Sequence, residues 1–246
     1  LEVLNLVTAR IDAEGGMRWP KAPAFQANST GPGGRGRGVT YGRRRSRVSG
    51  APEVMGEFPM GCLAEEIDTP DSAEGSRVRA LMTIASNPVL SAPNGPRLAA
   101  ALETLDFMLS IDVYLNETSR HADVILPGLS PLEESHYDSL FSQLAWTHAA
   151  RYSDAVLPAP EGAWPEWRAL MRLTALLEGH DSEASADVDA RDEDALRKDL
   201  HGLLTAAGVP EALRETQVHA LLKMTAQLRG PERQLDLGLR AGPWGD

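Results

Sequence analysis

The stretch Arg79–Pro127, RALMTIASNPVLSAPNGPRLAAALETLDFMLSIDVYLNETSRHADVILP, decides the fold. It contains three short apolar runs, Ala80–Ala85, Phe107–Ile111 and Val124–Leu126, which alternate with helix-like or turn-rich segments. This alternation predicts βαβ units and a parallel sheet. The run Leu81–Ala85 is continuous, as is typical of a strand buried on both faces.

Small or polar residues follow each apolar run, at the edge of an open parallel sheet where ligands bind. Ser86-Asn87-Pro88 follows the first run and Asp112 the second. Proline ends the strand and sets a turn. Asn87 can cap this turn with its side chain, and the backbone amides beyond it can face a phosphate or amide group. The alternative is an ordinary turn from strand to loop. Asp112 is either a turn aspartate or an acceptor for a sugar or base edge, and guanine offers two adjacent donors that suit a carboxylate.

Polar residues also crowd the segment 117–123, just before the third run. Thr118 is a possible donor to an anion, and Asp123 suits a turn into the strand. Histidine beside a strand end is more often a surface or packing residue than a catalyst, which is the interpretation for His121. We predict no metal site, because the acidic and histidine residues match no metal-binding spacing; those considered are Glu133, Glu134, His136 and Asp138.

Before this stretch, residues 18–50 are rich in glycine, proline, arginine and serine and predict a long loop. Six arginines and no acid lie between Gly31 and Gly50: Arg35, Arg37, Arg43, Arg44, Arg45 and Arg47. Two interpretations stay open. The arginines form either a solvated segment or an approach to an anionic ligand, since arginine pairs with phosphate in a bidentate manner.

After it, the linker Leu157–Gly162 precedes three helical patterns over Trp164–Leu177, Asp192–Leu204 and Pro210–Leu228. The predicted fold class is α/β, with a parallel Rossmann-like sheet, flanking helices and a helical C-terminal extension. We expect residues 1–156 to form part of one α/β domain and residues 157–246 to form the extension.

Composition excludes several classes of protein. A net charge of −11 and a pI near 5.0 argue against a nucleic-acid module. The single cysteine, Cys62, cannot form an internal disulfide or a cysteine-ligated iron–sulfur cluster. No apolar run is long enough to span a membrane, and we predict a cytoplasmic protein. The chain begins with Leu1 rather than Met and stops at Gly-Pro-Trp-Gly-Asp, so we expect a piece of a longer protein.

The order of these motifs resembles the molybdopterin oxidoreductases, the dimethyl-sulfoxide-reductase superfamily that includes formate dehydrogenases and nitrate reductases. That family has Gly-x-Asn-Pro after one strand, an acidic residue after the next, and a Thr-Glu-Thr-like segment leading into Ala-Asp-Val-(Val/Ile)-Leu-Pro. The counterparts here are Ser86-Asn87-Pro88, Asp112, Asn116-Glu117-Thr118 and Ala122–Pro127. The resemblance covers about residues 1–180 and is strongest over 79–127.

The resemblance implies a parent enzyme with molybdenum held by molybdopterin guanine dinucleotide, and 4Fe-4S clusters upstream of this segment. Ser86, Asn87 and Pro88 would form the turn beside the dinucleotide, Asp112 would bind the guanine or its ribose, and Thr118 and Asp123 would belong to the closing segment. The catalytic residues are not identified. The implied partners are the N- and C-terminal parts of the same parent chain and an electron-transfer subunit.

Two departures from the family pattern are alanines where the family has glycine, Ala85 and Ala9. Alanine holds only some of the conformations open to glycine. These two alanines favour an alternative function, a non-catalytic βα binding or subunit-interaction module that has lost the cofactor. On either interpretation we expect this segment alone to be inactive.

Overall fold

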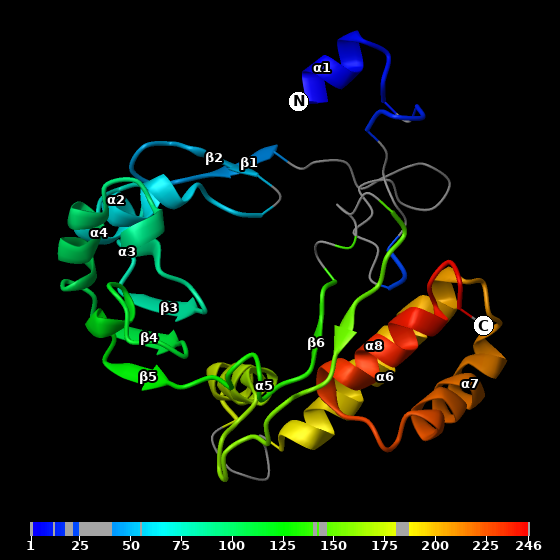
Figure 1. The fold of residues 1–246 in the computed structure, drawn as a ribbon. Helices are drawn as coiled ribbons and strands as arrows, with labels where there is room; N and C mark the ends of the chain where they lie inside the picture. Colours follow the sequence, from blue (N-terminus) through cyan, green and yellow to red (C-terminus); the bar gives the residue numbers. More distant parts are fainter. Residues whose placement is uncertain are drawn as a thin grey trace. The chain divides into compact units, whose positions relative to one another are not determined.

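The structure is a computed structural model that describes residues 2–11, 13–17, 22–24, 41–54, 56–139, 142, 147–180 and 187–245. The chain divides into two compact units (Figure 1). The sheet unit comprises residues 28–130 and 159–163, and the helical unit comprises residues 1–27, 131–158 and 164–246.

The sheet unit contains the predicted parallel sheet. Its strands are β3 (Ala80–Ile84), β4 (Phe107–Ile111) and β5 (Val124–Leu126), in the order β3-β4-β5. Ala80 lies opposite Phe107, and Leu109 lies opposite Val124. The short helix α3 (Pro88–Ser91) and helix α4 (Gly95–Leu102) connect β3 to β4, and the 3-10 turn η3 (Ser119–His121) precedes β5. The α/β fold class and the parallel pairing are confirmed.

One face of this sheet carries the core of the unit. Helix α2 (Leu63–Asp68) and α4 lie on the same side of β3 and β4 (Figure 1). Because side chains alternate along a strand, Leu81 and Met108 point to this face. The core residues are at most 8% exposed and comprise Ala64, Ile67, Leu98, Ala101, Leu102 and Met108.

The other face of the sheet differs from the expectation. Met82, Ile84 and Phe107 keep 43%, 39% and 45% of their surface exposed. The prediction that the first strand is buried on both faces is therefore wrong for β3. On the same face of the neighbouring strand β4, Leu109 and Ile111 are buried, at 7% and 1% exposed.

Strand β1 (Tyr41–Arg45) lies within residues 18–50, where the sequence predicts loop, and forms an antiparallel hairpin with β2 (Pro52–Val54). Four of the five residues of β1 are exposed, so the strand has no apolar alternation to reveal it. Glu53 is fully buried and accepts hydrogen bonds from the Arg43 backbone nitrogen at 3.1 Å and from its Nη2 at 2.7 Å. The Arg43 side chain is the main cause that lowers the pKa of Glu53 to about 2.

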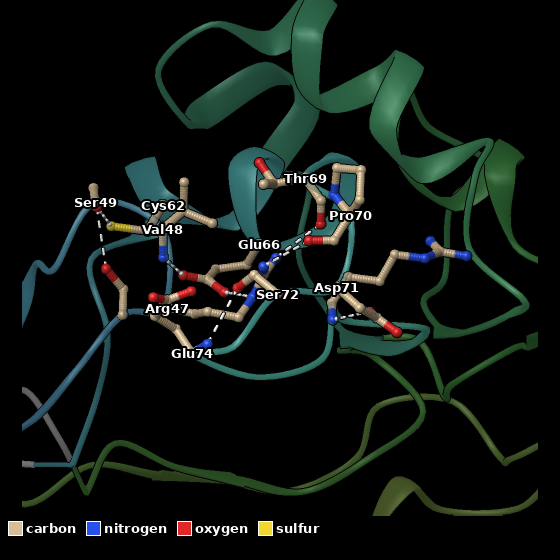
Figure 2. A network of polar contacts seen from close by, with 12 residues as sticks. Arg47, Val48, Ser49, Cys62, Glu66, Thr69, Pro70, Asp71, Ser72 and Glu74 are labelled. Carbon is tan, nitrogen blue, oxygen red and sulfur yellow. Dashed lines mark hydrogen bonds and ion pairs between the residues drawn. The ribbon is translucent and has the colours of Figure 1, made fainter.

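A second arginine, Arg47, joins the hairpin to the end of α2 (Figure 2). Its Nη1 and Nη2 donate to the carbonyl oxygens of Pro70 and Thr69, both at 2.9 Å. Glu66 on α2 lies 3.4 Å from Arg47 Nε and accepts from the Val48 backbone nitrogen at 3.0 Å. Arginine near a helix C-terminus satisfies backbone carbonyls that lack helical partners.

The helical unit contains five helices and a short hairpin among its described residues. The helices are α1 (Glu2–Val7), α5 (Glu166–Leu177), α6 (Val188–Ala206), α7 (Glu211–Met224) and α8 (Gly230–Arg240), and the strands are β6 (His136–Tyr137) and β7 (Tyr152–Ser153). Its core joins α6, α7 and α8 through Leu196, Leu200, Val218, Leu222 and Leu237. Along the described residues, no helix is long and apolar enough to cross a membrane.

Helix α8 is absent from the predicted elements. Its leucines at 235, 237 and 239 recur every second residue, which is not the helical spacing. The helix begins at Gly230, whose φ is +50°, against the ring of Trp167 on α5. Pro231 sits in its first turn, where proline is favoured.

Candidate functional site

The site begins with a strained turn after β3. Ala85 has a φ of +45°, and its backbone nitrogen donates to the Ile111 carbonyl oxygen at 2.8 Å. Ala9, at the end of α1 in the helical unit, has a φ of +54°. Both alanines therefore adopt the left-handed conformation that glycine tolerates without a steric cost.

Asn87 and Thr118 connect the turn after β3 to the loop after β4. Thr118 Oγ1 donates to Asn87 Oδ1 at 2.8 Å and accepts from the Val89 backbone nitrogen at 2.9 Å. Asn87 Nδ2 donates to Glu117 Oε2 at 2.6 Å, which holds the pKa of Glu117 below its usual value. Thr118 is fully buried. Its hydroxyl hydrogen is used within the protein, so Thr118 positions the two loops relative to one another.

Asp112 stands directly after β4 and is only 8% exposed. Its Oδ1 accepts from the Tyr114 backbone nitrogen at 3.0 Å, and its Oδ2 accepts from Asn116 Nδ2 at 2.9 Å. Among the described residues, no arginine, lysine or histidine forms an ion pair with Asp112. A carboxylate oxygen accepts about two hydrogen bonds, so each oxygen keeps room for one further donor.

Asn116 is a site residue that the sequence did not identify by itself. Its Oδ1 accepts from the backbone nitrogens of Thr118 and Ser119, both at 2.9 Å, while its Nδ2 donates to Asp112. Ser119 Oγ accepts from the Asn116 backbone nitrogen at 2.8 Å. Asparagine side chains commonly accept hydrogen bonds from the backbone two residues later in turns. This turn preference is the sequence signal that indicates the role of Asn116.

The remaining predicted residues lie in two places. Ser86 and Pro88 flank Asn87 at the carboxyl end of β3, and Pro88 is buried at the start of α3. Asp123 is separate from them: its Oδ2 accepts from the Met108 backbone nitrogen at 2.7 Å. That position is near the amino ends of β4 and β5, at the opposite edge of the sheet from Asp112.

The arginines of the basic segment are mostly engaged with the protein. Arg43 pairs with Glu53, Arg45 Nη1 donates to the Gly50 carbonyl oxygen at 2.8 Å, and Arg47 binds the end of α2. Arg44 is exposed. The predicted anion approach also relies on Arg35 and Arg37, which lie outside the described residues. Across the described ranges, no group of three or more histidine, cysteine, aspartate or glutamate side chains is arranged to hold a metal ion.

Comparison with known proteins yields several oxidoreductases. The chain is 33% identical over 101 residues to the assimilatory nitrate reductase catalytic subunit of Bacillus subtilis, and 29% identical over 99 residues to the F420-dependent formate dehydrogenase 1 subunit alpha of Methanococcus maripaludis. It is 28% identical over 177 residues to the thiosulfate reductase molybdopterin-containing subunit of Salmonella typhimurium. These regions cover 41%, 40% and 69% of this chain.

The matched regions are small parts of these relatives, at 13%, 14% and 23% of their lengths. No protein-family model matches the chain. The similarities confirm the resemblance to molybdopterin oxidoreductases at the level of the superfamily.

Proposed function

We propose that this chain is one part of a molybdenum-dependent oxidoreductase, similar to formate dehydrogenases, and that it supplies part of the cradle for molybdopterin guanine dinucleotide. The cradle is the carboxyl edge of the sheet, with Ser86, Asn87 and Pro88 after β3 and Asp112 and Thr118 after β4. When bound, the molybdenum–pterin group supplies the electron-transfer chemistry. The residues of this chain bind and orient its dinucleotide end.

The observation that carries this proposal is the state of Asp112. Its carboxylate is 8% exposed, has no ion-pair partner among the described residues, and accepts one hydrogen bond at each oxygen. A buried charge is costly unless it is paired or fully hydrogen-bonded. Guanine presents two adjacent N–H donors, which match the two carboxylate oxygens of Asp112 in chemistry and number. Tyr114 and Leu115 beside it are 75% and 76% exposed, which keeps the edge of the sheet open to a ligand.

The remaining parts of the expected cofactor system are extensions of this proposal. They comprise the pairing of two pterins around one metal, the 4Fe-4S clusters, an electron-transfer subunit and the rest of the parent chain. We propose that the isolated chain is inactive, because a pterin pair requires both halves of such a site. A cytoplasmic location belongs to the same proposal. Asp123 is not included in the cradle, because it binds the backbone of β4 at the other edge.

A second candidate function is a non-catalytic module that has lost the cofactor. Ala85 and Ala9 favour it, since alanine at φ +45° and +54° is strained where the family has glycine. The buried carboxylate of Asp112, which has hydrogen bonds but no ion-pair partner among the described residues, favours the first function.

The test is titration of the 246-residue chain with GMP and with AMP by calorimetry. We expect a preference for GMP that is lost in Asp112→Ala, with a weakening of tenfold or more, since hydrogen bonds to charged groups contribute roughly 1.5–3 kcal/mol each and tenfold in affinity is about 1.4 kcal/mol. Asp123→Ala is the matched control, because its carboxylate lies at the opposite edge. Equal affinity for the two nucleotides, or an unchanged Asp112→Ala variant, argues for the non-catalytic module.

A further inference from the structure

We infer that Asn116 is a positioning residue that fixes the orientation of the Asp112 carboxylate and couples it to the turn after β3. This inference rests on the proposed function, because it concerns how the same edge recognises its ligand.

The first step is the double use of the Asn116 amide. Its NH₂ group donates to Asp112 Oδ2 at 2.9 Å, and its carbonyl oxygen accepts from the backbone nitrogens of Thr118 and Ser119. The amide is therefore held at both ends and has little rotational freedom. Because its nitrogen approaches one oxygen while the Tyr114 nitrogen approaches the other, the plane of the carboxylate is set from two directions.

The second step is the continuation of this chain of hydrogen bonds. Asn116 holds the backbone of Thr118, and the Thr118 hydroxyl binds Asn87 Oδ1 at 2.8 Å and the Val89 backbone nitrogen at 2.9 Å. Asn87 and Asp112 belong to loops that follow different strands, β3 and β4. A ligand that contacts both loops thus meets two groups whose separation is fixed by Asn116 and Thr118.

The third step concerns protection from solvent. Thr118 and Ser119 are fully buried and Asp112 is 8% exposed, whereas Asn116 is half-buried, so the linkage is partly shielded from solvent. Hydrogen bonds in a shielded network are stronger than in water and strengthen one another. Removing the Asn116 amide leaves the Asp112 carboxylate with one donor, from Tyr114, among the hydrogen bonds described. The carboxylate then rotates or draws in water, and a base that needs both oxygens at once loses its fit.

The experiment uses the 246-residue chain, with Asn116→Ala, Asp112→Asn and the exchanged pair Asp112→Asn with Asn116→Asp. The exchanged pair rebuilds the hydrogen bond with the amide on residue 112 and the carboxylate on residue 116. Two readouts are taken: hydrogen exchange at the backbone amides of Thr118 and Ser119, and the ratio of GMP to AMP affinity by calorimetry.

We expect Asn116→Ala to speed exchange at both amides and to lower the GMP preference five- to tenfold. The exchanged pair should keep slow exchange but lose the GMP preference, because the carboxylate no longer follows β4 directly. Asp112→Asn should behave in the same way as the exchanged pair.

The outcomes separate the two ideas. If Asn116→Ala speeds exchange but keeps the full GMP preference, Asn116 only stabilises the turn and the positioning role is overturned, while the proposed function stands. If the exchanged pair keeps the GMP preference, the carboxylate position is unimportant and the inference fails. If the unchanged chain shows no GMP preference, the proposed function and the inference both fall.

Discussion

Replacing Ala85 by glycine is expected to stabilise the sheet unit. Ala85 holds a φ of +45° at the end of β3, and its side chain is exposed, so removing the methyl group sacrifices little packing. A left-handed conformation costs a residue other than glycine roughly 1–2 kcal/mol. Glycine has more conformational freedom than alanine in the unfolded chain, and ordering it costs roughly 0.5–1 kcal/mol more. This cost offsets part of the strain that is relieved. The expected net gain in the free energy of unfolding is about 0.5–1 kcal/mol.

The matched control is Ala100→Gly. Ala100 is exposed inside α4, in the same unit, where glycine costs about 1 kcal/mol relative to alanine. One alanine-to-glycine change should therefore stabilise the unit and the other should destabilise it, with a difference of about 1.5–2 kcal/mol between them. Opposite signs for the same chemical change can come only from the backbone conformation.

The assay uses a probe for each unit. Native-state hydrogen exchange at the amides of β4 reports the sheet unit. Tryptophan fluorescence in urea reports the helical unit, because all five tryptophans lie outside residues 28–130 and 159–163. We expect slower exchange in β4 for Ala85→Gly and unchanged fluorescence. Faster exchange in β4 for this variant refutes the claim that the turn is strained at Ala85.

Three further predictions concern the supporting structure. Gly230→Ala places a methyl group 2.6 Å from the Trp167 ring and should destabilise the helical unit by roughly 1–3 kcal/mol. Gly202→Ala, with no atom within 4 Å of the added methyl group, should stabilise the unit by about 0.8–1 kcal/mol. Urea unfolding followed by fluorescence measures both changes in stability, and changes of the same sign contradict the account. Arg47→Ala should destabilise the sheet unit by roughly 1–3 kcal/mol, because it leaves the carbonyls of Thr69 and Pro70 without their donor. The control Arg44→Ala should change the free energy of unfolding by no more than about 0.5 kcal/mol. Equal effects of the two variants on hydrogen exchange in β4 argue against a structural role for Arg47. The Arg43 guanidinium lowers the pKa of Glu53 to about 2 from an ordinary value of 4.5. The ion pair therefore contributes its full stability above pH 4.5 and loses it as the pH falls toward 2. Glu53→Gln should flatten the exchange-versus-pH curve of the sheet unit between these two pH values, and an unaltered curve shows that Glu53 is not the titrating group.

The sheet could be predicted because its strands differ sharply from their surroundings. Ala80–Ile84, Phe107–Ile111 and Val124–Leu126 are apolar runs bounded by proline, glycine and charged residues. The hairpin β1–β2 could not be predicted in this way. Its buried side-chain contact joins Glu53 to an arginine ten residues earlier, and no local pattern in Tyr41–Arg45 indicates that contact.

The sequence named the members of the candidate site but did not indicate the hydrogen bonds that connect them. Asn87 and Asp112 were predicted from their places after strands, and Thr118 from the polar segment before the third strand. The sequence does not show that Thr118 uses its hydroxyl hydrogen within the protein. Asp123 was placed in the same group by the family resemblance, which assigns it and Thr118 to one closing segment. Its hydrogen bond to Met108 belongs to the other edge, because β5 lies between Asp123 and the carboxyl edge. Asp112 and Asp123 lie at opposite edges because one follows its strand and the other precedes its strand, and the two strands pair in parallel.

The most direct test of the central claim is the content of guanine nucleotide and molybdenum in the product of the complete open reading frame that encodes this chain. The protein is purified, the nucleotide is released with acid, and both are measured per polypeptide for the unchanged protein and for Asp112→Ala. The account predicts stoichiometric molybdenum and guanine nucleotide in the unchanged protein and a clear loss of both in Asp112→Ala. A well-folded protein without metal and without guanine nucleotide contradicts it.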